Sequence, residues 1–291
     1  MRGGTAPRYK EGCTSEFKSF YKTVNGNEGE KCNYSTRLDL YGCGCFHNCD
    51  YCYARSLLSF RGLWDEKNPR IADIDKVRRK IRTIKPGSIV RLGGMTDCFQ
   101  PCERAHHVTY QAIEALNQQQ VGYLIVTKSH LVAEPEYLEL FDKHLAHIQV
   151  SVTTLDDGRS ASYERASPPS KRIEAIYKLQ EQGFDVAIRL SPLIEDFIDF
   201  DKLNALEIGQ GLVEFLRVNA WVRRWMSGVD FSKYTYHQSG YDHLPLEEKI
   251  RILDRIRFGT ITVCDDVTEH YQYFKEHVNP NREDCCNLRF I

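Results

Sequence analysis

Seven short runs of apolar and β-branched residues recur along the chain and alternate with segments of helical periodicity. The runs are nearly continuous in apolar character, which is typical of strands buried on both faces of a sheet. They lie at residues 37–41, 88–92, 122–127, 148–153, 185–190, 213–218 and 260–263. Between them apolar residues repeat at spacings of three and four, as at Ala105, Val108, Ala112 and Leu116. The alternation predicts β-loop-α units around a parallel sheet.

Several predicted strands end in small or polar residues, at which a ligand could bind. These are Gly93 and Gly94, Lys128 and Ser129, Thr153 and Thr154, and Ser191 and Pro192. Ligands gather at the carboxyl ends of strands both in barrels and in doubly wound sheets. Six or seven units fit a complete or partial barrel. A doubly wound sheet also fits, because periodicity does not distinguish a closed sheet from an open one.

The composition is that of an ordinary globular protein. Of the 291 residues 42% are hydrophobic, and 39 Lys and Arg nearly balance 40 Asp and Glu. This balance excludes a disordered chain and a strongly basic, histone-like binder, but it allows a local nucleic-acid groove. No stretch approaches the roughly 18 apolar residues needed to span a bilayer, and the polar residues 1–10 hold no signal-peptide core. We therefore expect a cytoplasmic protein without membrane association, whose thiols stay reduced.

The chain contains 11 cysteines, an odd number that argues against a closed set of disulfides. Cys45, Cys49 and Cys52 are the most closely spaced, with three and then two residues between them. A loop of this length can place three thiolates on one face of an iron–sulfur cluster and leave one iron open, since such clusters usually take four cysteines. The alternative is a zinc site formed from these residues with Cys43 or His47. Colour distinguishes the two, because an iron–sulfur protein is brown and a zinc protein is colourless.

Six motifs in order along the chain resemble those of the spore photoproduct lyase-like branch of the radical SAM superfamily. The first is GCFHNCDYCYAR at 44–55, and the second is GGMTDCFQP at 93–101. The others lie at 126–129, 151–156, 167–176 and 189–194. Together they run from about Tyr41 to Ile194, which is half of the chain. The C-terminal third carries no motif of this branch.

The resemblance implies a fold and an activity. The fold is a partial (β/α)6 TIM-like barrel at 36–264, with an N-terminal extension at 1–35 and a C-terminal tail at 265–291 that caps the barrel. The activity is reductive cleavage of S-adenosylmethionine at a [4Fe–4S] cluster, which yields a 5′-deoxyadenosyl radical that abstracts a hydrogen atom from a substrate. The cofactor then performs the difficult chemistry, while the protein orients and shields it. A flavodoxin- or ferredoxin-type protein would supply the electron.

The resemblance also implies residue roles. Cys45, Cys49 and Cys52 would ligate the cluster, and Tyr51 and Tyr53 would lie near the adenosyl group. Gly93 and Gly94 would present backbone carbonyls to the methionine amino group, which glycine suits because the main chain can approach a ligand closely. The remaining contacts to the methionine carboxylate and ribose would come from Thr96, Lys128, Ser151, Thr153, Arg189 and Ser191. A simpler interpretation of these positions is a solvated lysine, ordinary strand residues and a glycine turn.

One position departs from the branch. The enzyme that gives the branch its name uses a cysteine as hydrogen-atom donor just before the Thr/Ser-Asp pair of its second-strand motif. In this chain the matching position is near Gly94 or Met95. Cys98, which follows Asp97, is a candidate substitute donor. We therefore expect a relative with a different substrate.

The other cysteines allow a second, auxiliary iron–sulfur cluster, although they show no compact ligand spacing. Cys98 and Cys102 follow the second-strand motif, and Cys285 and Cys286 lie in the tail. The alternative is that these thiols are small buried hydrophobic groups. Counting iron distinguishes these alternatives.

Three hypotheses address the substrate. The first is a nucleic acid or nucleoside, favoured by the basic run at 78–82 with Lys85, by Arg223 and Arg224, and by the aromatic residues of 221–241, because bases stack on aromatic rings and phosphates attract Arg and Lys. A charge run is, however, usually a solvated helix face. The second is a peptide or a small metabolite. The third is a zinc-binding adaptor without catalysis, which would not explain motifs after successive strands.

Overall fold

A computed structural model describes residues 17–22 and 32–289 of the chain. Its centre is a sheet of eight strands in the order β1-β2-β5-β6-β7-β8-β9-β12, in which β1 is antiparallel to β2 and the remaining pairs are parallel. The sheet strands are β1 (Phe20–Lys22), β2 (Thr36–Leu38), β5 (Ile89–Leu92), β6 (Gly122–Thr127), β7 (Ala146–Ser151), β8 (Asp185–Leu193), β9 (Gln210–Phe215) and β12 (Thr260–Val263).

Helices and two small hairpin-like sheets complete the described part of the chain. The helices are α2 (Tyr53–Phe60), α3 (Ile74–Ile81), α4 (Glu103–His106), α5 (Val108–Gln119), α6 (Pro135–Leu140), α7 (Asp157–Ala161), α8 (Pro169–Glu181), α9 (Phe200–Asn204), α10 (Ala220–Trp225), α11 (Leu246–Leu253) and α12 (Thr268–His277). Short 3₁₀ helices are η1 (His130–Ala133), η2 (Glu195–Phe197) and η3 (Phe231–Lys233). The small sheets pair β3 (Tyr41–Gly42) with β4 (Arg70–Ile71) and β10 (Tyr236–Gln238) with β11 (Tyr241–His243).

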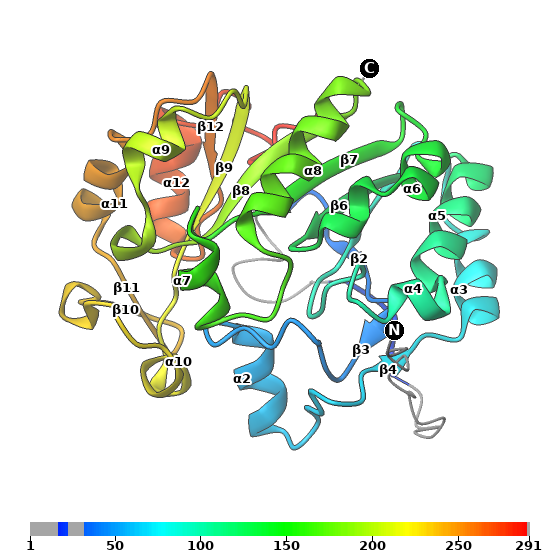
Figure 1. Ribbon diagram of the computed structural model, residues 1–291, viewed down its shortest axis with the longest axis horizontal. Coiled ribbons are helices and arrows are strands. Elements are labelled where there is room, and N and C mark those ends of the chain that lie inside the picture. The colour runs from blue at the N-terminus through cyan, green and yellow to red at the C-terminus, as the bar shows by residue number, and fades with distance from the viewer. Residues whose placement is uncertain (1–16, 23–31, 290–291) are drawn as a thin grey trace, which may run out of the picture.

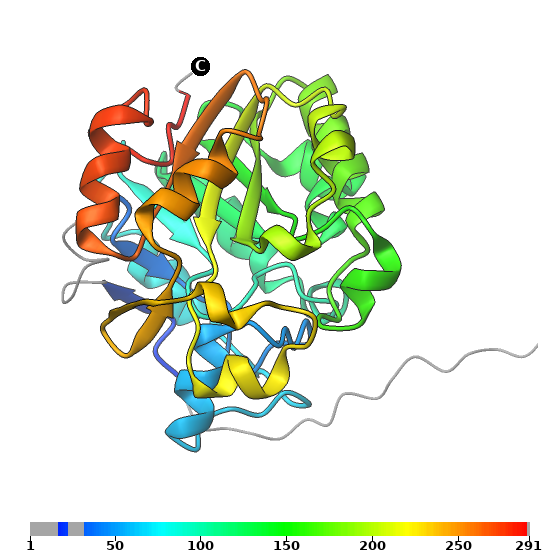
Figure 2. The same ribbon diagram turned by 90° about the vertical axis from the view of Figure 1, so that its left-hand side faces the viewer.

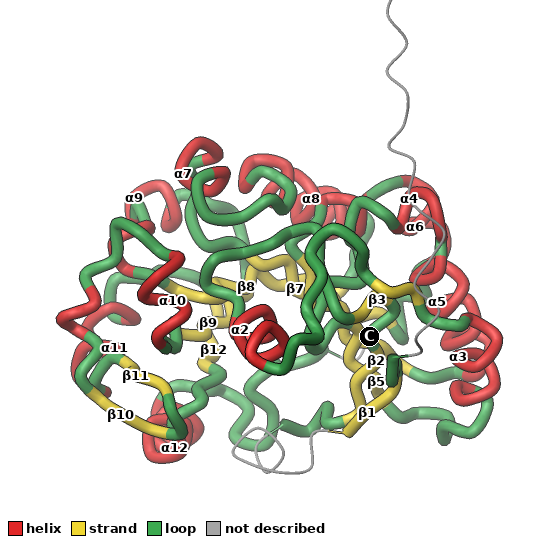
Figure 3. The backbone as a smooth tube through the Cα atoms, turned by 90° about the horizontal axis from the view of Figure 1, so that it is seen from below, coloured by secondary structure: helices red, strands yellow, loops and turns green. Residues whose placement is uncertain are grey.

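The strand order decides between the two architectures that the sequence allows. The parallel strands follow one another in chain order, whereas a doubly wound sheet reverses its order at a switch point. The strands form an arc with the larger helices on its outer side, and α2 lies over the middle of the arc (Figures 1 and 3). The two edge strands, β1 and β12, are not paired with each other, so the barrel is open. The predicted partial TIM-like barrel is confirmed.

All seven predicted strands are present, and their burial explains the apolar runs. The six residues of β7 are all buried, as are five of the six in β6. The predicted helix around Ala112 is interrupted at His107, whose φ of 48° ends α4 and begins α5. The strand β1 falls within the predicted extension 1–35, so part of that extension joins the sheet edge. The other predicted domain boundaries stay predictions.

The C-terminal tail returns to the barrel after α12, which stands beside β12 (Figure 2). The side-chain amide of Gln210 on β9 donates to the carbonyls of Cys286 and Asn287, at 3.4 and 3.1 Å. The amide of Arg289 donates to Asp185 on β8 at 3.0 Å. The tail is thus tied to two strands of the sheet.

The aromatic segment 219–246 also has a defined place. It forms α10, η3 and the β10–β11 hairpin, and it packs against α2. Asn219 donates from its side chain to Ser56 Oγ at 3.1 Å, and the guanidinium of Arg55 lies 4.1 Å from the ring centroid of Trp225. Within the described residues, no helix is both long and apolar enough to cross a membrane.

A buried ion pair fixes α8 against the sheet. Arg172 is fully buried and donates to the carbonyl of Ser151, at the end of β7, at 3.0 Å and to the carbonyl of Ser167 at 2.6 Å. Its third nitrogen, Nη2, donates to the carboxylate of Glu164, which is also buried. Removing one member of a buried pair leaves the other charge uncompensated, which is costly.

We predict that Arg172→Met lowers the free energy of unfolding by about 3–5 kcal/mol, the usual cost of breaking a buried pair. Lys171→Met is the matched control, because Lys171 is the neighbouring residue and its pair with Glu174 is exposed. It should change stability by about 0.5 kcal/mol or less. Urea unfolding followed by far-ultraviolet circular dichroism measures both. Equal losses in the two variants would contradict the anchoring role of Arg172.

Candidate active site

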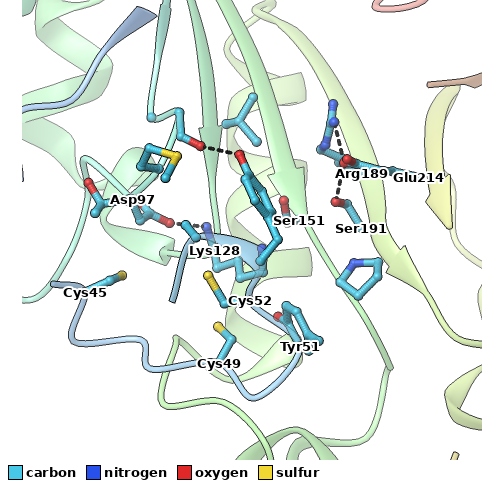
Figure 4. Close-up of a pocket in the computed structure, with 18 of the residues that line it drawn as sticks. Cys45, Cys49, Tyr51, Cys52, Asp97, Lys128, Ser151, Arg189, Ser191 and Glu214 are labelled. Atoms are coloured by element: carbon cyan, nitrogen blue, oxygen red, sulfur yellow. Dashed lines mark hydrogen bonds and ion pairs between the residues drawn. The ribbon is translucent and has the colours of Figure 1, made fainter. Parts of the chain in front are cut away.

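The carboxyl ends of the parallel strands open into one pocket, and a loop with four cysteines, three of which line the pocket, forms another of its walls. We call residues 43–52 the cysteine loop. Cys45, Cys49 and Cys52 line the pocket, and in Figure 4 their sulfur atoms point into the same space. The strand ends contribute Gly93, Gly94, Lys128, Ser151, Arg189, Ser191 and Glu214. Polar groups that are far apart in the sequence thus meet the thiols across one pocket.

The cysteine loop is folded by its own backbone and ends at the amino terminus of α2. The amide of Asn48 donates to the carbonyl of Cys45 at 3.1 Å, and the amide of Cys52 donates to the carbonyl of Cys49 at 3.2 Å. Cys52 is the N-cap residue of α2, and its sulfur accepts the amide of Arg55 at 3.4 Å. A thiolate at this position is stabilised by the partial positive charge of the helix terminus.

Burial favours the protonated form of the other two thiols. It raises the pKa of Cys45 to about 12. Burial and the charge of Glu164 also raise the pKa of Cys49, while Lys128 acts in the opposite direction. Metals bind the thiolate form of cysteine, so a metal that binds here must displace these protons.

Glu164, the partner of Arg172, holds the cysteine loop. Its carboxylate accepts hydrogen bonds from the hydroxyl of Tyr51 and, at 3.8 Å, from the thiol of Cys49. Burial alone would raise the pKa of Glu164, but the charges of Arg172 and Lys128 lower it. The carboxylate is therefore ionised, and it connects α8 and the end of β7 to the middle of the cysteine loop.

Asp97 holds the loop after β5 against the end of β6. Its carboxylate accepts the hydroxyl of Thr127 at 2.8 Å, the amide of Lys128 at 2.7 Å and the amide of Phe99 at 2.8 Å. The Nδ1 atom of His47, in the cysteine loop, lies 3.4 Å away. Burial works to raise the pKa of Asp97, but His47 and the backbone donors lower it to about 2. One buried carboxylate thus fixes three pocket-lining segments.

Asp39 has the same function at the end of β2. It accepts the amide of Gly94 at 2.7 Å, the amide of Met95 at 3.1 Å and the hydroxyl of Tyr21 at 3.1 Å. The carbonyl of Gly94 accepts the hydroxyl of Tyr53 at 2.9 Å. Burial raises the pKa of Asp39, against these hydrogen bonds. Hydrogen bonds to the backbone amides and to the carbonyl of Gly94 thus fix the orientation of the glycine turn.

Glu214 on β9 organises the far wall of the pocket. It accepts hydrogen bonds from Arg189 and Ser191, both at 2.7 Å (Figure 4). Burial would raise its pKa, but Arg189 and Arg217 lower it. The guanidinium of Arg217 lies 4.0 Å from the ring centroid of Tyr53 and connects this wall to the start of α2.

Twelve of the residues predicted from the sequence line the pocket. They are Cys45, Cys49, Tyr51, Cys52, Tyr53, Gly93, Gly94, Thr96, Lys128, Ser151, Arg189 and Ser191. The other two do not. Cys98 is completely buried in the main apolar core, and Thr153 is buried with its hydroxyl 2.7 Å from that of Tyr163. Cys98 therefore does not line the pocket, and its role as a hydrogen-atom donor stays a prediction.

Sequence reasoning missed the residues that position the pocket. Asp39, Asp97 and Glu214 carry a recognisable signal, because each is a charged residue within or just after a predicted buried strand. Glu164 and Arg172 carry none, because their burial depends on a contact between α8 and the cysteine loop.

A family model described as the radical SAM superfamily matches residues 40–202, more than half of the chain and the part that forms most of this pocket. The chain belongs to the radical SAM superfamily. This is the superfamily that the motifs predicted.

Two uncharacterized proteins are similar in sequence. One, from Methanocaldococcus jannaschii, is 27% identical over 165 residues, which are 54% of this chain and 60% of that protein. The other, from Acidianus two-tailed virus, is 25% identical over 181 residues, which are 58% of this chain and 59% of that protein. The chain thus spans about 60% of the length of these curated relatives.

Two solved structures share the fold at low identity. Spore photoproduct lyase complexed with dinucleoside spore photoproduct has a TM-score of 0.58 and 16% identity, over 80% of this chain and 76% of that chain. Streptococcus suis SuiB bound to S-adenosylmethionine has a TM-score of 0.52 and 14% identity, over 82% of this chain and 52% of that chain. At these identities the likeness shows the fold alone.

The radical SAM family implies a [4Fe–4S] cluster and S-adenosylmethionine, and the residues present fit both. Three thiols face one pocket, which is one fewer than the usual four ligands of a cluster. Within the described residues, no group of three or more His, Cys, Asp or Glu side chains is arranged for a metal ion. Thiolates on different irons of a cluster lie further apart than those on one ion. The buried hydroxyl of Ser151 has no hydrogen-bond partner in this part of the chain, and a pocket ligand could bind it.

We predict that Gly93→Ala weakens binding of S-adenosylmethionine to the reconstituted protein by tenfold or more. Gly93 has a φ of +81°, and an added Cβ would lie 3.1 Å from the carbonyls of Thr96 and Val126. The strain is about 1–2 kcal/mol, and the turn must shift to relieve it. Gly209→Ala is the control, because its Cβ would meet nothing within 4 Å. Isothermal titration calorimetry measures both affinities, and equal affinities would refute a role for this turn.

Proposed function

We propose that this protein reductively cleaves S-adenosylmethionine and uses the resulting 5′-deoxyadenosyl radical to abstract a hydrogen atom from a nucleic acid or nucleoside. The main support is the meeting of three thiols with the polar strand ends in one pocket. When bound, the cluster supplies the electron that breaks the sulfonium C–S bond. A flavodoxin- or ferredoxin-type protein would deliver that electron.

In this proposal Cys45, Cys49 and Cys52 hold the cluster through three irons. The helix terminus at Cys52 stabilises negative charge on its sulfur. Lys128 stands 5.5 Å from the ring centroid of Tyr51 and also lines the pocket. Its ammonium would attract the methionine carboxylate by a charge-assisted hydrogen bond.

The remaining contacts to S-adenosylmethionine come from strand ends. Gly93 and Gly94 present backbone groups to the methionine amino group, and Ser151 offers its unpartnered hydroxyl. Arg189 and Ser191 already donate to Glu214. We therefore assign these two residues to positioning Glu214, whose carboxylate would accept a hydroxyl of the ribose. Thr96 donates to the carbonyl of Tyr41, so its part is to hold the turn.

Aromatic residues on α10 support a substrate with aromatic bases. Trp221 and Trp225 lie with their ring centroids 5.2 Å apart on this helix, which packs against α2, and the first residues of α2, Tyr53 and Ala54, line the pocket. Arg224 is exposed on the same helix. Bases stack on aromatic rings, and arginines bind phosphates. The structure of spore photoproduct lyase with a dinucleoside adds the support of a related fold that binds such a molecule.

The other basic run lies far from these aromatic residues. Residues 78–82 belong mainly to α3, which lies at the opposite end of the molecule from α10 (Figures 1 and 3). Arg78 pairs with Glu114 at 3.6 Å, and Arg79, Lys80 and Arg82 are exposed. This run is therefore a solvated helix face, the alternative that its sequence also allowed.

We predict that Cys49→Ala abolishes both the cluster and the conversion of S-adenosylmethionine to 5′-deoxyadenosine. In this variant only two cysteines remain, so the iron that Cys49 would bind has no cysteine ligand. Cys43→Ser is the matched control, because Cys43 lies in the same loop but outside the pocket lining. Anaerobic reconstitution, reduction with dithionite and chromatography of the products measure turnover. Wild-type protein with a full cluster and no turnover would refute the proposed activity.

We predict that single-stranded DNA or RNA binds the full chain with an affinity that falls as salt rises, because phosphate contacts release counterions. Arg224→Ala should weaken binding several-fold and reduce the salt slope by about one. Arg79→Ala, an exposed arginine on α3, is the control. Fluorescence anisotropy over a salt series measures both. Flat salt dependence would refute the nucleic-acid substrate and direct attention to peptides, which SuiB of the related fold binds.

A further inference from the structure

Four cysteines outside the cysteine loop gather on another wall of the pocket. Cys285 and Cys286 are buried in a small apolar cluster, and Cys32 and Cys264 pack against the same cluster. Three of the four, Cys32, Cys264 and Cys285, also line the pocket. We call these four residues the second cysteine group.

Three distant segments supply the second cysteine group. Cys32 precedes β2, Cys264 directly follows β12, and Cys285 and Cys286 belong to the tail after α12. These segments meet side chains of the central strands, among them Leu124 on β6 and Leu212 on β9, so the tertiary fold alone assembles the group. No compact spacing of cysteines in the sequence predicts this group.

Hydrogen bonds fix the tail so that its two cysteines face the group. The carboxylate of Asp284 accepts the hydroxyl of Tyr34 at 2.6 Å and the amide of Cys286 at 2.8 Å. Gln210 holds the carbonyl of Cys286, as described above. The position of the cysteines is thus set by contacts to the segment before β2 and to β9.

The thiols of this group are in contact with one another and are not joined by disulfides. Cys285 lies close enough to Cys264 and Cys286 for their side chains to interact. Cys32 lies close enough to Cys286 for their charges to interact. All four are free cysteines. Apolar packing does not require four thiols at one point, whereas iron–sulfur clusters require four cysteine ligands.

Arginines surround the group, and this is a second, independent observation. Arg91 and Arg189 act on the charge of Cys286, and Arg91 and Arg37 act on that of Cys32. Arg37 and Arg91 are opposite each other in the pairing of β2 with β5. The Nε atom of Arg91 is buried and has no hydrogen-bond partner within the described residues. Such a site stabilises an anion, and a cluster bound by four thiolates is anionic.

We propose that Cys32, Cys264, Cys285 and Cys286 bind a second iron–sulfur cluster, separate from that of the cysteine loop. The assignment goes beyond the proposed function and does not depend on its substrate. Four cysteines are the usual ligand set of one such cluster. The assignment also differs from the set that the sequence suggested, since Cys98 and Cys102 lie in the main core.

The test uses full-length protein in which Cys45, Cys49 and Cys52 are all replaced by alanine. After anaerobic reconstitution with iron and sulfide, this variant should hold about four iron and four sulfide atoms per chain, the content of one cubane cluster. It should be brown and bleach with dithionite. The wild-type protein should hold about twice as much iron. Because the variant lacks the first cluster, the result is independent of S-adenosylmethionine cleavage.

Further substitutions in the triple variant locate the ligands. Adding Cys285→Ser and Cys286→Ser should remove the remaining iron, whereas adding Cys43→Ser should leave it unchanged. Circular dichroism confirms that each variant is folded. The proposal is overturned if the folded triple variant takes up no iron and sulfide, if it binds zinc without sulfide, or if its iron survives loss of Cys285 and Cys286.

Discussion

Four carboxylates, three of them buried and that of Glu214 half-buried, hold the pocket of this protein in shape. Asp39, Asp97, Glu164 and Glu214 each lie in or beside the pocket wall and accept several hydrogen bonds from groups on other segments. A buried charge is costly unless it is paired and hydrogen-bonded. The hydrogen bonds that each carboxylate needs therefore hold the surrounding loops in place. The shape of the site depends on these four carboxylates.

The carboxylates also separate the hydrogen-bond donors of the pocket into two sets. They bind the donors that position loops, such as Arg172 and Arg189, and leave other donors available for a ligand. Lys128 and the hydroxyl of Ser151 belong to this second set. The result is a pocket in which the walls are rigid and the free polar groups face the thiols of the cysteine loop.

The cysteines separate into three kinds of environment. Four lie in the cysteine loop, and three of these, Cys45, Cys49 and Cys52, line the pocket. Four more form the second cysteine group, and Cys98 and Cys102 are core residues. Cys13 lies outside the described residues. The excess of thiols in the composition thus reflects two separate walls of one pocket.

The sequence by itself determined the strands, the family and the loop whose cysteines line the pocket. Apolar runs indicate strands that are buried on both faces of a sheet. Short glycine-containing motifs indicate places where the backbone approaches a ligand closely. Only the tertiary structure decided between a barrel and a doubly wound sheet, because strand order is a long-range property. It also removed Cys98 from the pocket and brought Glu164, Arg172 and the second cysteine group to it. Their partners lie far away in sequence, so no local pattern of hydrophobic and polar residues records these contacts.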